Sequence, residues 1–88
     1  MIYVNEDNLR NNFAYNMRYL RLMQKPHMSQ AALAKKLGVT RKSIHRYETA
    51  VCLPPIHILV AMTECFGYTM DELLDARLPD KKGLKNNE

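Results

Sequence analysis

The chain repeats apolar residues every three or four positions over most of its length, which is the spacing of one face of an α-helix. Leu9, Phe13, Met17 and Leu20 show this spacing first. Apolar and polar residues do not alternate over any long stretch, so no sheet is expected, and only Met1–Val4 resembles a strand. With 88 residues, the chain has room for one small hydrophobic core. The sequence therefore predicts a compact all-α domain.

Capping residues, prolines and glycines divide this pattern into five helices. Asn5 or Asp7 begins the first helix, and Pro26 stops it because the residue before a proline is pushed out of the α region. The later helices begin at a hydroxyl side chain or at the pair Pro54-Pro55. Their predicted ranges are 30–37, 41 to about 50, 54–66 and 70–74. The fourth helix is apolar on most sides, so it is either central or in contact with a partner.

Charge is distributed unevenly along the sequence, whose net charge is +4. Residues 8–47 contain nine Lys and Arg and no acid, whereas residues 48–80 contain six acids and one Arg. A basic half of this kind attracts polyanions, of which nucleic acid is the commonest. The sequence lacks an apolar run long enough to span a bilayer and a signal-peptide pattern at its start. We therefore expect a cytoplasmic protein that does not contact a membrane.

Metal binding and catalysis find no support in the sequence. Cys52 and Cys65, together with the three histidines, lack the paired spacing of a zinc site, so two free thiols and no metal or other cofactor are expected. The sequence also shows no pair of catalytic carboxylates, no nucleophile motif and no phosphate-binding glycine loop. We expect a protein that is not an enzyme.

Residues 29–50 have the pattern of a helix-turn-helix, in which Gly38-Val39-Thr40 joins two short helices. At 100° per residue, one arc of about 140° on the second of these helices contains only polar or basic residues. This arc consists of Arg41, Lys42, His45, Arg46 and Thr49. Ile44 and Tyr47 lie on the opposite side. An anchored helix with a cationic outer face suits the major groove of DNA, where Arg and Lys donate to guanine O6 and N7.

The stretch from Met28 to Glu48 resembles the Cro/C1-type (XRE-like) helix-turn-helix of phage repressors and small bacterial regulators. It has the pattern MSQxxLAxxLGVTRxxIxxYE. The resemblance extends over roughly residues 13–75 and implies a five-helix, lambda-repressor-like domain with the helix-turn-helix in helices 2 and 3. Residues 13–76 would form this DNA-binding domain. Residues 1–12 would be an N-terminal segment or the start of helix 1, and residues 77–88 would be a flexible polar tail.

The resemblance also implies roles for individual residues. The base-reading positions are matched by Arg41, Lys42 and Arg46, with His45 close by. The phosphate-contacting positions are matched by Gln30, Thr40 and Ser43. Arg21 and Glu48 match a structural ion pair between the first helix and the recognition helix, although Arg21 could equally contact a phosphate.

Three features depart from the family pattern. Residues 1–12 precede the family core without a matched role, and they would either lengthen helix 1 or form an arm that contacts DNA or the other subunit. The loop from Lys25 to Met28 lengthens the step between the first two helices. Ala50 stands where the family usually has glycine, so either Ala50 adopts a strained positive φ or the recognition helix continues towards Cys52.

The function implied by the resemblance is sequence-specific binding of double-stranded DNA. A homodimer would insert its third helices into the major groove of an inverted-repeat operator and act as a repressor. The alternative is a protein-interaction module, such as an antitoxin that binds a toxin or an antagonist of another regulator. The apolar fourth helix and residues 1–12 would then supply the contact surface.

Overall fold

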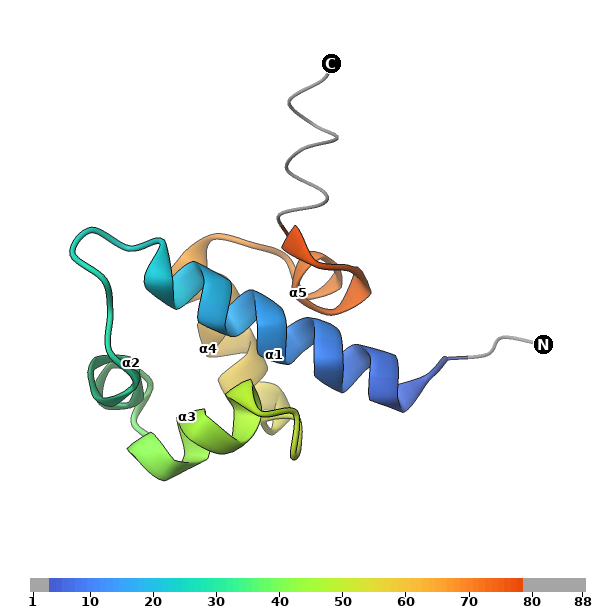
Figure 1. The fold of residues 1–88 in the computed structure, drawn as a ribbon, viewed down its shortest axis with the longest axis horizontal. Coiled ribbons are helices and arrows are strands. Elements are labelled where there is room, and N and C mark those ends of the chain that lie inside the picture. Colours follow the sequence, from blue (N-terminus) through green and yellow to red (C-terminus); the bar gives the residue numbers. More distant parts are fainter. Residues whose placement is uncertain (1–3, 79–88) are drawn as a thin grey trace, which may run out of the picture.

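The computed structural model describes residues 4–78, which form five helices and no strand. The helices are α1 (Glu6–Leu22), α2 (Gln30–Leu37), α3 (Arg41–Glu48), α4 (Ile56–Phe66) and α5 (Met70–Asp75). Figure 1 shows α1 crossing the molecule, with α2 and α3 below it, α5 along its upper edge and α4 behind. The predicted all-α, five-helix architecture is confirmed.

Side-chain caps fix where most of the helices begin. Asn5, and not Asp7, caps α1, and its side chain accepts a hydrogen bond from the backbone N–H of Asn8 at 3.1 Å. The hydroxyls of Ser29, Thr40 and Thr69 accept the equivalent bonds at the starts of α2, α3 and α5. Each such cap satisfies a backbone donor that the first helical turn leaves without an intrahelical partner.

The fourth helix begins later than the sequence predicts. Pro54 and Pro55 both precede α4, and Pro55 occupies the N-cap position without a side-chain hydrogen bond. The ψ of Pro55 is 159°, an extended value, so the helical turn starts only at Ile56. The two prolines therefore direct the chain into α4 without forming its first turn.

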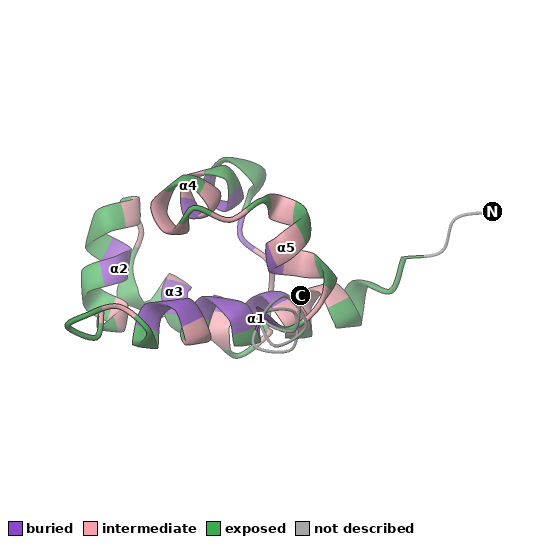
Figure 2. Ribbon diagram, turned by 90° about the horizontal axis from the view of Figure 1, so that it is seen from above, coloured by how far each residue is buried: buried purple, intermediate pink, exposed green. Residues whose placement is uncertain are grey.

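Side chains from all five helices meet in one hydrophobic core. The most deeply buried of its side chains are Phe13, Met17, Leu33, Ile44, Met62 and Leu73. Figure 2 shows the buried residues on the sides of the helices that face one another and the exposed residues on the outer sides. Burial of one such side chain contributes about 1.5–3 kcal/mol, so the shared core determines how α3 is held against α1 and α2.

Asn16 is a fully buried polar residue that ties α1 to the segment after α5. Its Nδ2 donates to the carbonyl oxygens of Leu73 and Ala76, both at 2.8 Å. Its Oδ1 accepts from the backbone N–H of Leu78 at 2.7 Å, and the Leu78 side chain is buried in the core. Ordered packing thus extends through residue 78, further than the predicted boundary at 77, because Leu78 completes the core. The rest of the predicted tail, residues 79–88, lies outside the described residues.

The recognition helix does not continue towards Cys52, and it ends earlier than the predicted position near Ala50. Its last helical residue is Glu48, and Ala50 has a φ of 61°. The chain turns there through hydrogen bonds from the N–H of Thr49 to the His45 carbonyl and from the N–H of Val51 to the Arg46 carbonyl. An alanine at positive φ is strained by about 1–2 kcal/mol.

Candidate nucleic-acid interface

The turn between α2 and α3 is fixed by backbone conformation and hydrogen bonds. Gly38 has a φ of 74°, a left-handed conformation that lets the chain leave α2 without steric strain. The next N–H, that of Val39, donates to the Ala34 carbonyl at 3.0 Å. Thr40 then caps α3 by accepting a hydrogen bond from the N–H of Ser43 at 3.1 Å. These contacts hold α2 and α3 as one helix-turn-helix unit.

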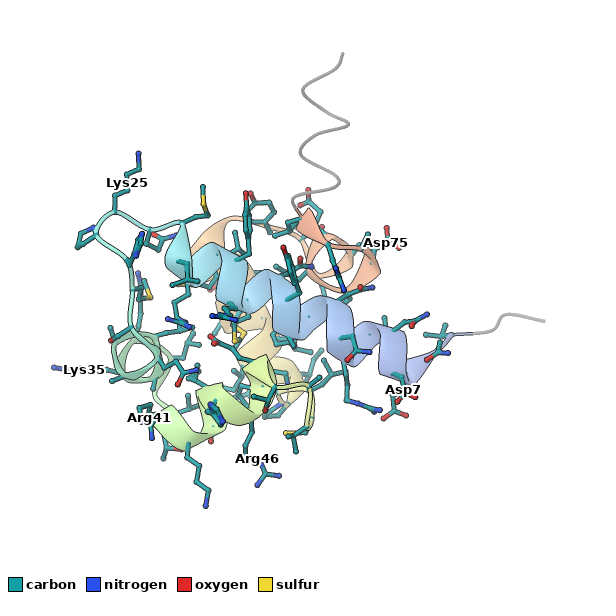
Figure 3. All side chains as sticks on the ribbon, in the orientation of Figure 1. Asp7, Lys25, Lys35, Arg41, Arg46 and Asp75 are labelled. Carbon is teal, nitrogen blue, oxygen red and sulfur yellow. The ribbon has the colours of Figure 1, made fainter. Side chains whose placement is uncertain are left out.

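The two sides of α3 have opposite chemical character. Ile44 and Tyr47 are buried in the core. The predicted base-reading residues Arg41, Lys42, His45 and Arg46 are all exposed. Figure 3 shows the side chains of Arg41 and Arg46 extending from α3 away from the body of the protein. The outward face of α3 therefore presents cationic hydrogen-bond donors to solvent.

Arg21 and Glu48 form a buried, bidentate ion pair between α1 and the end of α3. Nε of Arg21 donates to Oε2 of Glu48 at 2.8 Å, and Nη2 donates to Oε1 at 2.9 Å. The two side chains are only 10% and 3% exposed. Glu48 is the one acidic residue in α3. Because its carboxylate is neutralised by Arg21 inside the protein, it does not reduce the positive charge of the outward face of α3.

The same arginine organises the loop that departs from the family pattern. Nη1 of Arg21 donates to the carbonyl oxygen of Met28 at 2.9 Å, and the N–H of Met28 donates to the Arg21 carbonyl at 3.1 Å. These bonds close the loop between α1 and α2 onto the end of α1. With all three guanidinium nitrogens bonded within the protein, Arg21 is not placed to contact a phosphate.

Gln30 connects this ion pair to the outward face of α3, a link that sequence reasoning missed. Nε2 of Gln30 donates to Oε1 of Glu48 at 3.0 Å. Oε1 of Gln30 accepts from Nη1 of Arg41 at 3.4 Å, a long and therefore weak bond. A chain of hydrogen bonds thus runs from Arg21 through Glu48 and Gln30 to the exposed guanidinium of Arg41.

The hydroxyl groups at the two ends of α3 have different surroundings. Thr40 and Ser43 bring their hydroxyl oxygens within 3.0 Å of each other at the N-terminus of α3. The Thr49 hydroxyl is instead bonded to the carbonyl oxygen of His45 at 2.9 Å, at the C-terminal cap. Thr49 therefore supports the end of the helix and does not extend the cationic arc.

The described part of the chain shows neither a cluster of potential metal ligands nor a membrane-spanning helix. Among residues 4–78, no three His, Cys, Asp or Glu side chains gather closely enough to hold a metal ion. None of the five helices in that range has the length and apolar character needed to cross a bilayer. Cys52 and Cys65 are free, half-buried thiols.

A capped helix-turn-helix with an exposed cationic second helix, seated on a small all-α core, defines this protein as a DNA-binding regulator. The sequence profile of the helix-turn-helix family matches residues 17–73, and the chain belongs to that family. The resemblance to Cro/C1-type regulators is thereby confirmed.

A solved structure has the same fold over nearly its whole length. It is the crystal structure of a hypothetical transcription factor, NHTF, from Neisseria. The two chains are 25% identical, with a TM-score of 0.71, and the match covers 96% of this chain and 93% of that one. No curated protein matches the sequence.

Proposed function

We propose that this protein is a sequence-specific regulator that binds double-stranded DNA by placing α3 in the major groove. The observation that carries the proposal is the division of α3 into two faces. Ile44 and Tyr47 are packed into the core, while Arg41 and Arg46 extend into solvent. A helix held from behind in this way can enter a groove without disturbing the fold.

Base reading is assigned to the exposed cationic face. Arg41, Lys42 and Arg46, with His45 beside them, offer donors to the acceptor atoms of guanine in the major groove. A bidentate Arg–guanine pair contributes about 1–3 kcal/mol of discrimination against other bases. Sequence preference then depends on how these side chains are directed from α3.

Phosphate contact is assigned to the N-terminal ends of α2 and α3. Gln30 is the first residue of α2, and Thr40 and Ser43 lie at the start of α3. Free backbone N–H groups and the positive end of the helix dipole favour an anion at such positions. Contacts of this kind position a protein on the duplex without reading its sequence.

The proposed unit of binding is a homodimer that acts as a repressor. A two-fold symmetric pair places its recognition helices about 34 Å apart, which is one turn of the DNA helix. The matching operator is an inverted repeat, and a dimer bound there represses transcription by excluding polymerase.

Selection from randomised duplex DNA tests this proposal. Sequencing of the retained pool should recover an inverted repeat whose half-sites are about 10 base pairs apart, centre to centre. If the dimer neutralises six to ten phosphates, affinity should fall about 10³–10⁵-fold between 50 and 200 mM salt. A protein that retains no duplex at low salt would contradict the proposal.

Single substitutions separate base reading from general attraction to DNA. Arg41→Ala and Arg46→Ala should each relax the sequence preference at one base pair. Lys25→Ala is the matched control, because it removes one positive charge at the opposite edge of the molecule (Figure 3). This control should keep the full preference. Unchanged preferences in the two α3 variants would refute the base-reading assignment.

A further inference from the structure

The outward face of α4 carries apolar side chains that the core does not use. Ile56 and Val60, one turn apart, are 64% and 43% exposed, whereas Ile58, Leu59 and Met62 on the inner side are buried. At 100° per residue, the outward arc also includes the exposed residues His57 and Glu64. We call Ile56, His57, Val60 and Glu64 the α4 face. Exposed apolar patches rimmed by polar residues mark interaction sites.

We propose that the α4 face is where a second copy of this chain docks, with the two α4 helices packed antiparallel and centred on Val60. This inference rests on the homodimer of the proposed function and specifies the surface that forms it. The choice of a second copy as the partner follows from the charges on the other helix faces. The antiparallel direction of the two α4 helices follows from the polar side chains on the α4 face itself.

A two-fold interface brings a surface patch against its own copy, so a patch dominated by one sign of charge repels itself. The outward faces of α2 and α3 are cationic, through Lys35 and Lys36 on α2 and the base-reading residues on α3. The outer face of α1 carries the exposed Arg18, and Arg77 lies 4.8 Å over the ring of Tyr15 on the same face. The faces of α2 and α3 are therefore unsuited to a two-fold contact. At the end of α1, the exposed apolar residues Leu22 and Met23 line the same surface hollow as Arg18, so a two-fold contact there would bring like charges together.

The acidic end of the molecule presents mostly charged side chains. Glu6 and Asp7 at the start of α1 pair with Arg10, and Asp71 and Asp75 on α5 are exposed. The α4 face combines two exposed aliphatic side chains, Ile56 and Val60, with one imidazole and one carboxylate, and α4 contains no Lys or Arg. It can meet its own copy without opposing like charges.

The direction of packing follows from the order of residues along the α4 face. In an antiparallel pair centred on Val60, Glu64 of one copy lies opposite Ile56 and beside His57 of the other, where an imidazole N–H can donate to the carboxylate. A parallel pair would instead bring the two Glu64 side chains together. The N-terminus of α4 has no side-chain cap, so its helix dipole also favours a nearby carboxylate.

This arrangement leaves the DNA-binding surface open. None of the cationic residues of α3 belongs to the α4 face, and the loop 49–55 separates the two helices along the chain. Figure 1 shows this loop leading from the end of α3 to the start of α4. The surface proposed for pairing and the surface proposed for DNA binding therefore share no residue.

Sedimentation of the full chain over about 1–100 μM, the range expected for a small interface, tests the proposed surface. Val60→Asp places two carboxylates against each other at the centre and should make the protein monomeric. Since Val60 is exposed, the melting temperature extrapolated to low concentration should not change. Met23→Asp is the matched control, because Met23 is a similarly exposed apolar residue directly after α1. This control should keep the dimer.

A charge exchange tests the antiparallel register. His57→Glu should weaken association at least tenfold, because it faces Glu64 of the second copy. Adding Glu64→Lys to that variant should restore association towards the wild-type level. A double variant as weak as His57→Glu would overturn the antiparallel pairing.

DNA binding separates this inference from the function on which it rests. Val60→Asp should bind an isolated half-site as the wild type does and should lose about tenfold or more in affinity for the inverted repeat. A Val60→Asp variant that dimerises like the wild type would overturn the α4 face as the interface. So would a wild-type chain that is monomeric both in solution and on the inverted repeat. If no duplex binds at all, the proposed function fails, while sedimentation still decides the α4 pairing.

Discussion

Replacing one partner of the Arg21–Glu48 pair should destabilise the fold far more than replacing both. Glu48→Met leaves the guanidinium of Arg21 buried without its counter-charge, and Arg21→Met leaves a carboxylate in the same situation. Removing one partner of a buried ion pair costs about 3–5 kcal/mol, because the remaining charge is still desolvated. The low exposure of both side chains, 10% and 3%, places this pair in that class.

The double variant Arg21→Met/Glu48→Met removes both charges together and puts apolar side chains of similar length in their place. The remaining loss comes from the bond between Arg21 and the Met28 carbonyl and from the bond between Gln30 and Glu48. At about 0.5–1.5 kcal/mol for each bond, the double variant should lose about 1–3 kcal/mol. The two single losses would sum to about 6–10 kcal/mol if they were independent. The difference predicts a coupling energy of several kcal/mol between Arg21 and Glu48.

Urea and thermal unfolding followed by circular dichroism measure these losses. A loss of 3 kcal/mol lowers the melting temperature by at least about 12 °C in a domain of this size, since each kcal/mol shifts it by about 4–8 °C. Arg10→Met is the control, because Arg10 pairs with the exposed carboxylates of Glu6 and Asp7, and it should change stability by less than about 1 kcal/mol. Single losses below about 1 kcal/mol, or a double loss equal to their sum, would refute the reasoning.

Three further substitutions test other features of the fold and the site. Ala50→Gly should stabilise the protein by about 0.5–1 kcal/mol, because glycine adopts a φ of 61° without strain; a lower urea midpoint would contradict this. Asn16→Leu should cost at least about 2–3 kcal/mol in urea unfolding, because three backbone groups lose their partner; a loss under 1 kcal/mol would show that they find another. Gln30→Ala should weaken binding to every duplex and also relax the preference for the base pair that Arg41 reads. Equal losses on all sequences would leave phosphate contact as the only role of Gln30.

Helix limits could be predicted from the sequence where they depend on local chemistry. The range 30–37 is the same in the prediction and in α2, because the Ser29 cap and the left-handed Gly38 act within one turn of the helix they bound. The end of α3 could not be predicted in this way. Alanine disfavours a positive φ, so the sequence left two conformations open at Ala50, and the structure shows the positive φ together with a hydrogen bond from the N–H of Val51 to the Arg46 carbonyl.

The candidate site shows the same division between local and long-range information. Helical periodicity alone predicts that Arg41 and Arg46 share a face opposite Ile44. The bond between Gln30 and Arg41 joins residues 11 positions apart, and the bond between Asn16 and Leu78 joins residues 62 apart. No repeat or local motif marks either pair, since their contacts arise only when separate helices pack together.

The bonds made by Asn16 set a minimum length for any fragment meant to carry the recognition helix into another protein. The family match ends at residue 73, yet the amide of Leu78 satisfies Asn16 and its side chain fills the core. A fusion that stops at the family boundary would keep the bond from Asn16 to the Leu73 carbonyl but would lose the partners of Asn16 at Ala76 and Leu78 and the core contact of the Leu78 side chain. A fragment that is to fold in another protein therefore has to run through residue 78. During synthesis, the hydrophobic core can be completed only after Leu78 has left the ribosome.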